Sequence, residues 1–265
     1  MTAVNQSIRF EDAAAYERYM GKWSQYVGDT FLNWLAPKTG SRWLDVGCGN
    51  GAFTEILIER CAPGSVHGID PSDQQLVYAR ARPSLRGAQF QQADAMALPF
   101  PDDSFDAAVM PLVIFFVPDP AKGVAEMARV VCPGGTVSAY AWDMEAGGFP
   151  YELVRSEMRA LGLEVPTPPS PDASRLDALE QLWAGAGLAA IETRAITVHR
   201  VFADFDDYWQ TVLGGPSVGG KLSAMPEATL AHLKSRLGEQ LSKDHSGRIT
   251  CSAQANAVKG RVPAP

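Results

Sequence analysis

Three glycines stand close together in the segment Leu44-Asp45-Val46-Gly47-Cys48-Gly49-Asn50-Gly51, at the end of a short apolar run. Glycine lets the backbone adopt positive φ angles and lets a ligand approach the main chain closely. If a helix begins after this turn, its first N–H groups are free to bind that ligand. The spacing Gly47-x-Gly49-x-x-Ala52 also satisfies the dinucleotide-binding fingerprint. On its own, the glycine turn predicts a nucleotide-like ligand without distinguishing one from another.

A carboxylate follows where the next apolar segment, Gly68-Ile69-Asp70, ends. At the end of a second strand, Asp70 can accept hydrogen bonds from both hydroxyls of an adenosine ribose. NAD and S-adenosylmethionine both carry that ribose, so the glycine turn and Asp70 together leave both cofactors open.

Three further features favour S-adenosylmethionine. Asp45 precedes the glycines, where an acid would repel a pyrophosphate but attract an ammonium and a sulfonium group. Asp94-Ala95 follows the third apolar segment, where a carboxylate and a backbone N–H can bind adenine. The stretches 98–106 and 132–135 (Cys-Pro-Gly-Gly) lead into the next two strands. A nicotinamide enzyme would also need a proton donor such as a Tyr-x-x-x-Lys pair, and none follows the sheet core.

The elements that must position these residues alternate between strand and helix, which predicts an α/β fold with a doubly wound parallel sheet. After Trp142 the alternation ends, and two long strands enclose a helical insertion. The strands are expected at 42–46, 65–70, 88–93, 105–110, 136–141, 189–202 and 248–261, and the helices at 9–19, 23–35, 52–60, 74–81, 121–131, 151–161, 175–186, 204–213 and 226–242.

On these motifs the sequence resembles the class I S-adenosylmethionine-dependent methyltransferases. The likeness is greatest to their small-molecule branch (type 11 domain), with the quinone-biosynthesis C-methyltransferases as relatives. It is specific over residues 43–141 and looser over 16–24. The resemblance implies a Rossmann-like, seven-stranded and mostly parallel sheet with an antiparallel last strand. It divides the chain into an N-terminal helical lid (1–36), a cofactor-binding core (37–145) and a C-terminal part (146–265) with a helical cap at about 203–247.

The resemblance also assigns cofactor roles to individual positions. Some of these residues have a simpler interpretation: the glycines as a tight turn, Ser72 as a helix cap, Asp94 as a turn residue, and Tyr19, Trp23 and Met96 as packing residues. The implied roles are Asp45, Gly47, Cys48 and Gly49 for the methionine portion; Asp70, Pro71, Ser72 and Gln75 for the ribose; Asp94, Ala95 and Met96 for adenine; Met110, Pro111 and Leu112 beneath the sulfonium; and Tyr19 and Trp23 closing over the cofactor.

The expected reaction is an in-line displacement that leaves S-adenosylhomocysteine and depends mainly on positioning in a dry site. A base is needed only where the acceptor must lose a proton. Asp143 and His199 are the candidates, although a turn residue and a structural histidine describe them more simply. Aromatic residues such as Phe116, Tyr208 and Trp209 predict a small hydrophobic or aromatic acceptor. Use of the cofactor for regulation or for other chemistry is the alternative.

Composition narrows the partners. The formal net charge of −7 argues against a nucleic acid substrate. The longest apolar run, 107–117, is interrupted by Pro111 and falls short of the about 20 residues that span a bilayer. With no apolar signal segment at the start, we expect a cytoplasmic protein without membrane attachment. The four cysteines show no metal-binding spacing, so no metal is expected. The oligomeric state, monomer or homodimer, stays open.

Overall fold

The computed structural model describes residues 17–215 and 218–264. Its sheet has seven strands in the order β3-β2-β1-β4-β5-β7-β6. The five strands from β1 to β5 are parallel, and β7 runs antiparallel to both of its neighbours. The predicted fold class is therefore confirmed. The strands are β1 (Arg42–Val46), β2 (Ser65–Asp70), β3 (Gln89–Gln92), β4 (Phe105–Pro111), β5 (Val131–Trp142), β6 (Ala189–Phe202) and β7 (Ile249–Arg261).

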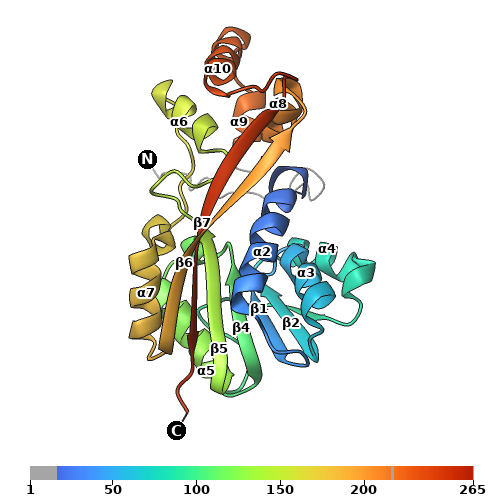
Figure 1. Ribbon diagram of the computed structural model, residues 1–265, viewed down its shortest axis with the longest axis vertical. Helices are drawn as coiled ribbons and strands as arrows, with labels where there is room; N and C mark the ends of the chain where they lie inside the picture. The colour runs from blue at the N-terminus through green and yellow to red at the C-terminus, as the bar shows by residue number, and fades with distance from the viewer. Residues whose placement is uncertain (1–16, 216–217, 265) are drawn as a thin grey trace.

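Helices cover both faces of the sheet (Figure 1). One layer contains α2 (Lys22–Leu35), α3 (Ala52–Cys61) and α4 (Asp73–Ala81), and the other contains α5 (Pro120–Val130) and α7 (Leu176–Gly185). Only the first residue of β1 is exposed, as expected for a central parallel strand covered on both sides. This doubly wound arrangement brings the carboxyl ends of β1, β2 and β4 to one edge.

A long hairpin of β6 and β7 extends beyond the rest of the sheet. The β5 pairing of β7 stops at Ala255, whereas its pairing with β6 continues to Ile249. Helices lie at the tip of the hairpin, with α6 (Glu152–Ala160) beside them (Figure 1). They are α8 (Phe205–Leu213), α9 (Gly219–Ser223) and α10 (Glu227–Gln240), and we call these three helices the cap. They occupy the place where the sequence predicts an inserted cap, and α9 was not predicted.

Two local predictions differ from the structure. The fifth strand begins at Val131 instead of residue 136, and its pairing with β4 shifts register between Phe105 and Ala107. The first expected helix, 9–19, lies mostly outside the described residues, and its described end belongs to a π-helical turn, Glu17–Gly21. At Gly21, a Cβ would lie 2.5 Å from a carboxylate oxygen of Glu17, so a larger residue there would have to displace that side chain.

Across residues 17–215 and 218–264, no helix has the length and apolar character needed to cross a bilayer.

Candidate functional site

A cavity of about 620 Å³ lies at the carboxyl edge of β1, β2 and β4. The strand order reverses between β1 and β4, and ligands of doubly wound sheets bind at this switch point. The volume is within the range of small-ligand sites. Another cavity, about 420 Å³, lies at the opposite edge and contains none of the predicted site residues. Of the predicted cofactor residues, Gly47, Cys48, Gly49, Asp70, Pro71, Ser72, Gln75, Pro111 and Leu112 line the larger cavity.

The glycine turn is held against β2 and leaves room above it. The N–H groups of Gly47 and Cys48 both donate to the carbonyl of Ile69, at 2.8 and 2.9 Å. Gly47 has a φ of 78°, and a Cβ there would lie 2.5 Å from Val113 Cγ2. Gly49 has a φ of 53°, and the nearest atom to its missing Cβ, Gln75 Oε1, is 4.0 Å away. The turn is therefore tight at Gly47 and open toward the cavity at Gly49.

Asp70 joins the glycine turn to the start of α4. One carboxylate oxygen accepts the Gly49 N–H at 3.0 Å, and the other accepts the Ser72 N–H at 2.9 Å. Burial raises the pKa of Asp70, and these two backbone hydrogen bonds oppose that rise. A carboxylate offers about four acceptor positions, so each oxygen keeps capacity for a further donor. Because Asp70 also lines the cavity, it fits the predicted role of accepting two ribose hydroxyls.

Ser72 and Gln75 provide a second indication of a ligand. Ser72 Oγ accepts the Gln75 N–H at 3.4 Å, so it caps α4 as the simpler interpretation holds, while it also lines the cavity. The Gln75 side chain is 5% exposed, and its Oε1 has no hydrogen-bond partner among the described residues. A buried acceptor without a donor is costly. This oxygen fits the ammonium or hydroxyl donors that S-adenosylmethionine carries.

Asp45 lies out of contact with the cavity. It is fully buried, one oxygen accepts the Thr54 hydroxyl at 2.6 Å, and Oδ1 has no partner among the described residues. Burial raises the pKa of Asp45 to about 7; the Thr54 hydrogen bond lowers it and the Asp70 charge raises it. The structure therefore does not place Asp45 among the residues that line the cavity, although the sequence predicts contact with the methionine portion.

The residues predicted for adenine lie outside the cavity lining, and so does Met110, whereas Pro111 and Leu112, also predicted beneath the sulfonium, line the cavity. Asp94 is exposed and accepts the Met96 N–H at 2.8 Å within a tight turn, which matches the simpler interpretation of Asp94. Ala95 and Met96 are half-buried beside it, and Met110 is fully buried in the core. The structure therefore gathers the ribose residues and three of the methionine residues, Gly47, Cys48 and Gly49, but not Asp45 and not these four.

Tyr19 and Trp23 are buried in an aromatic cluster instead of lining the cavity. Tyr19 stacks on Tyr151 with ring centroids 4.2 Å apart, and the Trp23 indole donates to the Tyr151 hydroxyl at 3.1 Å. That hydroxyl donates to the Tyr19 carbonyl at 2.7 Å. Packing thus describes both residues, and Ser24, the neighbour of Trp23, lines the cavity in their place.

Neither candidate base lines the cavity. Asp143 accepts the Ala146 N–H at 3.0 Å and a Gln254 amide hydrogen at 3.3 Å, which is the pattern of a turn residue. His199 is exposed on β6, with Nδ1 2.9 Å from Ser252 Oγ. Within the described part of the chain, no cluster of side chains could hold a metal ion.

Some lining residues are missed by the sequence reasoning. Asn50 belongs to the glycine segment itself, so its place in the motif could have indicated it. Leu112 has the predicted place but an unexpected backbone: its φ is 59°, and its N–H donates to the Tyr140 carbonyl at 2.7 Å. Such strain in a non-glycine residue recurs at functional sites. The unassigned lining residues are Ser24, Asn50, Ala52, Phe53, Gln74 and Val113; Phe116 and Tyr140 were expected to lie near the acceptor.

Comparison with known proteins agrees with this geometry. Residues 44–139 match a family model described as a methyltransferase domain. The chain is 40% identical over 94 residues to 2-methyl-6-phytyl-1,4-hydroquinone methyltransferase 2 of Oryza sativa subsp. japonica, covering 36% of this chain and 27% of the relative. It is 37% identical over 116 residues to the demethylmenaquinone methyltransferase of Thermus thermophilus, covering 43% and 51%. The match thus spans about half or less of the length of these relatives.

The solved structures extend the likeness to the whole fold. Phosphoethanolamine N-methyltransferase 2 of Haemonchus contortus, in complex with S-adenosylmethionine, aligns with a TM-score of 0.58 at 20% identity, over 95% of this chain and 56% of that one. The [4+2]-cyclase SpnF aligns with a TM-score of 0.54 at 20% identity, over 90% and 81%.

A doubly wound sheet with a glycine turn at its switch point, and a carboxylate there that can accept ribose hydroxyls, is typical of a nucleoside-binding α/β domain. The match over residues 44–139 shows that this part of the chain is a methyltransferase domain, and its fold and glycine turn are those of the class I type, whose cofactor is S-adenosylmethionine.

Proposed function

We propose that this chain transfers the methyl group of S-adenosylmethionine to a small hydrophobic or aromatic acceptor by in-line displacement. The observation that carries the proposal is the composition of the one cavity at the switch point. Its lining combines polar groups, among them the glycine turn, Asp70 and Gln75. It also has apolar and aromatic side chains, among them Phe53, Leu112, Phe116 and Tyr140.

The polar and the apolar lining residues have different roles in this proposal. Asp70 would hold the ribose hydroxyls, and Gln75 Oε1 would accept a hydrogen bond from the bound nucleoside or its amino group. S-adenosylmethionine supplies, when bound, an electrophilic methyl group on a positively charged sulfur. Leu112 and Phe116 would exclude water from the reacting atoms and hold the acceptor in line. Such positioning can account for much of the barrier lowering, since the leaving sulfide needs no activation.

The lining residues also include few groups that could act as a general acid or base. Among the described residues that line the cavity, the ionisable ones are Cys48, Asp70 and Tyr140. Burial raises the pKa of Cys48 well above its usual range, and Asp70 already holds two backbone N–H groups. We therefore propose an acceptor that is nucleophilic, or ionises readily, without a protein base. Asp143 and His199 remain candidates only for a closed arrangement that brings them nearer.

The relatives support an apolar acceptor. Three of them are named for a phytyl hydroquinone, a fatty acid and demethylmenaquinone. We propose that the cap, α8 to α10, closes the acceptor side and gives this chain its own specificity. The net charge of −7 makes a nucleic acid an unfavourable partner.

The decisive experiment incubates the protein with methyl-labelled S-adenosylmethionine and an extract containing quinols and fatty acids. We expect S-adenosylhomocysteine to accumulate and the label to appear, by mass spectrometry, in an apolar small molecule. The Asp70→Ala variant is the matched control and should form neither product. Label in RNA or DNA would contradict the acceptor class.

The alternative is a protein that binds S-adenosylmethionine for regulation or for other chemistry. A structure with this fold is named a [4+2]-cyclase, so the fold alone does not establish methyl transfer. Tight binding of S-adenosylhomocysteine without its formation, whatever acceptor is offered, would favour this alternative.

A further inference from the structure

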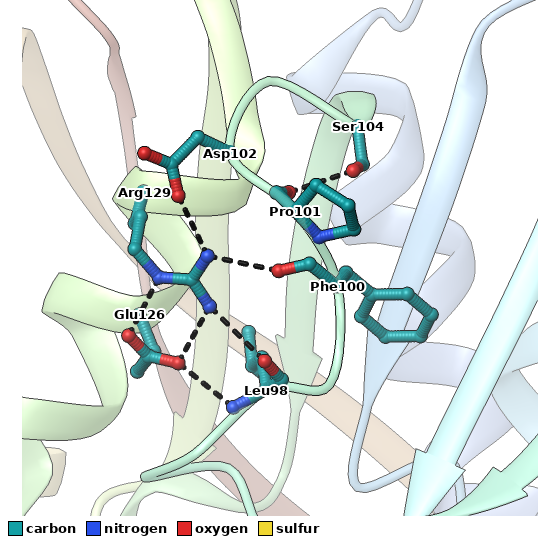
Figure 2. A network of polar contacts seen from close by, with 7 residues as sticks. All are labelled: Leu98, Phe100, Pro101, Asp102, Ser104, Glu126 and Arg129. Carbon is teal, nitrogen blue, oxygen red and sulfur yellow. Dashed lines mark hydrogen bonds and ion pairs between the residues drawn. The ribbon is translucent and has the colours of Figure 1, made fainter.

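The guanidinium of Arg129, on α5, donates three hydrogen bonds to the segment that follows the Asp94–Ala97 turn and two to Glu126 on its own helix (Figure 2). Nε donates to Glu126 at 2.8 Å. Nη1 donates to the Phe100 carbonyl and to Asp102, each at 2.8 Å. Nη2 donates to the Leu98 carbonyl at 3.0 Å and to Glu126 at 2.8 Å. Arginine carries five N–H donors in a fixed planar fork, and each of them has a partner here.

Glu126 completes the arrangement. The carboxylate oxygen that accepts from Arg129 Nη2 also accepts the Leu98 N–H, at 2.8 Å. Both backbone polar groups of Leu98 are therefore bound by one pair of side chains, as a neighbouring strand would bind them. The Leu98 side chain is 5% exposed and fixes the same residue from the core side. Hydrogen bonding to Arg129 lowers the pKa of Glu126, so the pair stays charged at neutral pH.

Leu98 directly follows the Asp94–Ala97 turn, to which the family resemblance assigns adenine binding. The Ala97 N–H donates to the Asp94 carbonyl at 3.0 Å, and these two residues form an isolated β-bridge. The same helix also touches the back of this turn, since a Cβ on Gly123 would lie 4.0 Å from the Ala95 carbonyl oxygen. The position of the Asp94–Ala97 turn at the edge of the sheet is thus set from α5, outside the cavity.

We propose that Arg129, together with Glu126, is a positioning residue for adenine, acting through Leu98 on the turn that begins at Asp94. The inference rests on the proposed function and adds to it that the bound cofactor extends its base from the cavity toward that turn, as the family resemblance implies. Loss of the pair would let the turn shift while the glycine loop and Asp70 keep their places. Cofactor affinity should fall, and the rate at saturating cofactor should change little.

The test measures S-adenosylhomocysteine binding by calorimetry, together with the thermal midpoint, for wild type and Arg129→Gln. We expect about tenfold weaker binding, the order of effect of one misplaced hydrogen-bonding group. Arg129→Lys should fail to restore the affinity, because an ammonium cannot reach both carbonyls and the carboxylate.

Arg42→Gln is the matched control. Arg42 makes a comparable fork with Asp106, at 2.8 and 3.2 Å, at the opposite edge of the sheet. It should lower the thermal midpoint by a similar amount and change affinity less than about twofold. If Arg129→Gln does not fold, Glu126→Gln replaces it, since the amide keeps an acceptor for Leu98 but loses the charge.

A double-mutant cycle with Asp94→Ala separates positioning from general stability. If Arg129 acts through the turn, the double variant binds no more weakly than the weaker single variant. Additive losses, normal binding by Asp94→Ala, or normal binding by a destabilised Arg129 variant would each overturn the inference. A wild-type protein that does not bind S-adenosylhomocysteine would instead remove the proposed function, and this inference with it.

Discussion

The cofactor edge of the sheet and the aromatic cluster beneath the cap differ in how far their buried polar groups are hydrogen-bonded. At the cofactor edge, Gln75 Oε1 lacks a partner among the described residues, and Asp70 keeps unused acceptor capacity. In the cluster, Arg200 Nη1 donates to the carbonyls of Arg18 and Tyr19 at 2.9 and 3.3 Å, and reaches the Tyr151 hydroxyl at 3.3 Å. The first region is arranged to receive a ligand, and the second to hold the chain together.

The difference follows the pattern of similarity. The family match covers residues 44–139 and stops before α6, the β6–β7 hairpin and the cap. The cofactor edge therefore keeps the chemistry that the class shares, and the cap is free to differ. If this division is real, variants at the cofactor edge and variants in the cap should change different measured quantities.

The largest expected effect is the pH dependence of stability that the buried carboxyl group of Asp45, in the strand leading to the glycine turn, produces. Between the usual pKa of 3.8 and the folded value of about 7, the folded state holds a proton that the unfolded state has released. The free energy of unfolding of wild type should therefore fall as the pH rises through this range. The total fall, relative to Asp45→Asn, is on the order of 4 kcal/mol, since one pKa unit is worth about 1.4 kcal/mol.

Urea unfolding at pH values from about 5 to 8 measures the part of this fall that lies above pH 5, which is on the order of 3 kcal/mol. Asp106→Asn is the control, because Arg42 lowers the pKa of Asp106 and leaves that carboxylate ionised throughout the range. Its difference from wild type should stay constant with pH. A parallel pH dependence of wild type and Asp45→Asn would contradict the buried, neutral carboxyl.

Most of the fold could be predicted from the sequence, because hydrophobic segments alternate with clear turn signals. β6 has the predicted bounds, and β7 begins one residue later than expected. What the sequence lacks is information on distant contacts. The π-helical turn at Glu17 receives a hydrogen bond from the distant Arg200, and β5 starts early because Val131 pairs with Phe105.

The site could be predicted where the backbone itself makes it. The glycine turn and Asp70 are read from spacing, because their roles depend on φ angles and strand ends. Tyr19 and Trp23 could not be placed, since their partner Tyr151 lies 128 residues from Trp23 along the chain. The strained φ of Leu112 leaves no sign in a leucine.

The second prediction sharpens the comparison at the glycine turn. Gly47→Ala places a Cβ 2.5 Å from Val113 and forces alanine to a φ of 78°. We expect unfolding to become easier by roughly 2 kcal/mol and S-adenosylhomocysteine to bind at least about tenfold more weakly. Gly134→Ala is a matched control, because Gly134 has the same φ of 78° with no atom within 4 Å of its Cβ. It should cost stability and leave the affinity unchanged.

The third prediction concerns the charge of the cofactor edge. Asp70→Ala removes the acceptor proposed for both ribose hydroxyls and frees the Gly49 and Ser72 N–H groups. Calorimetry should show S-adenosylhomocysteine binding weakened by at least about tenfold. Asp73→Ala, an exposed aspartate in the first turn of α4, should bind as wild type does. Unchanged affinity in Asp70→Ala would remove the ribose assignment.

The smallest expected effect on cofactor affinity is that of a substitution in the cap, which tests whether the two regions are independent. Trp209 is 2% exposed, stacks parallel to Phe205 with centroids 6.4 Å apart, and carries the ammonium of Lys234 4.9 Å from its ring. Trp209→Leu should lower the free energy of unfolding by about 2 kcal/mol. Because no residue of the cap lines the cofactor cavity, the affinity for S-adenosylhomocysteine should change less than about twofold.

The outcome of this last variant decides how far the two regions are separate. The cap meets the N-terminal turn, since a Cβ on Gly215 would lie 2.7 Å from the Tyr19 ring. That turn in turn reaches the cavity, because Glu17 accepts hydrogen bonds from Asn50 at 3.3 Å and Arg82 at 3.0 Å. A loss of cofactor affinity in folded Trp209→Leu would therefore trace a coupling through this turn, and acceptor binding and cofactor binding would then be linked by the same contacts.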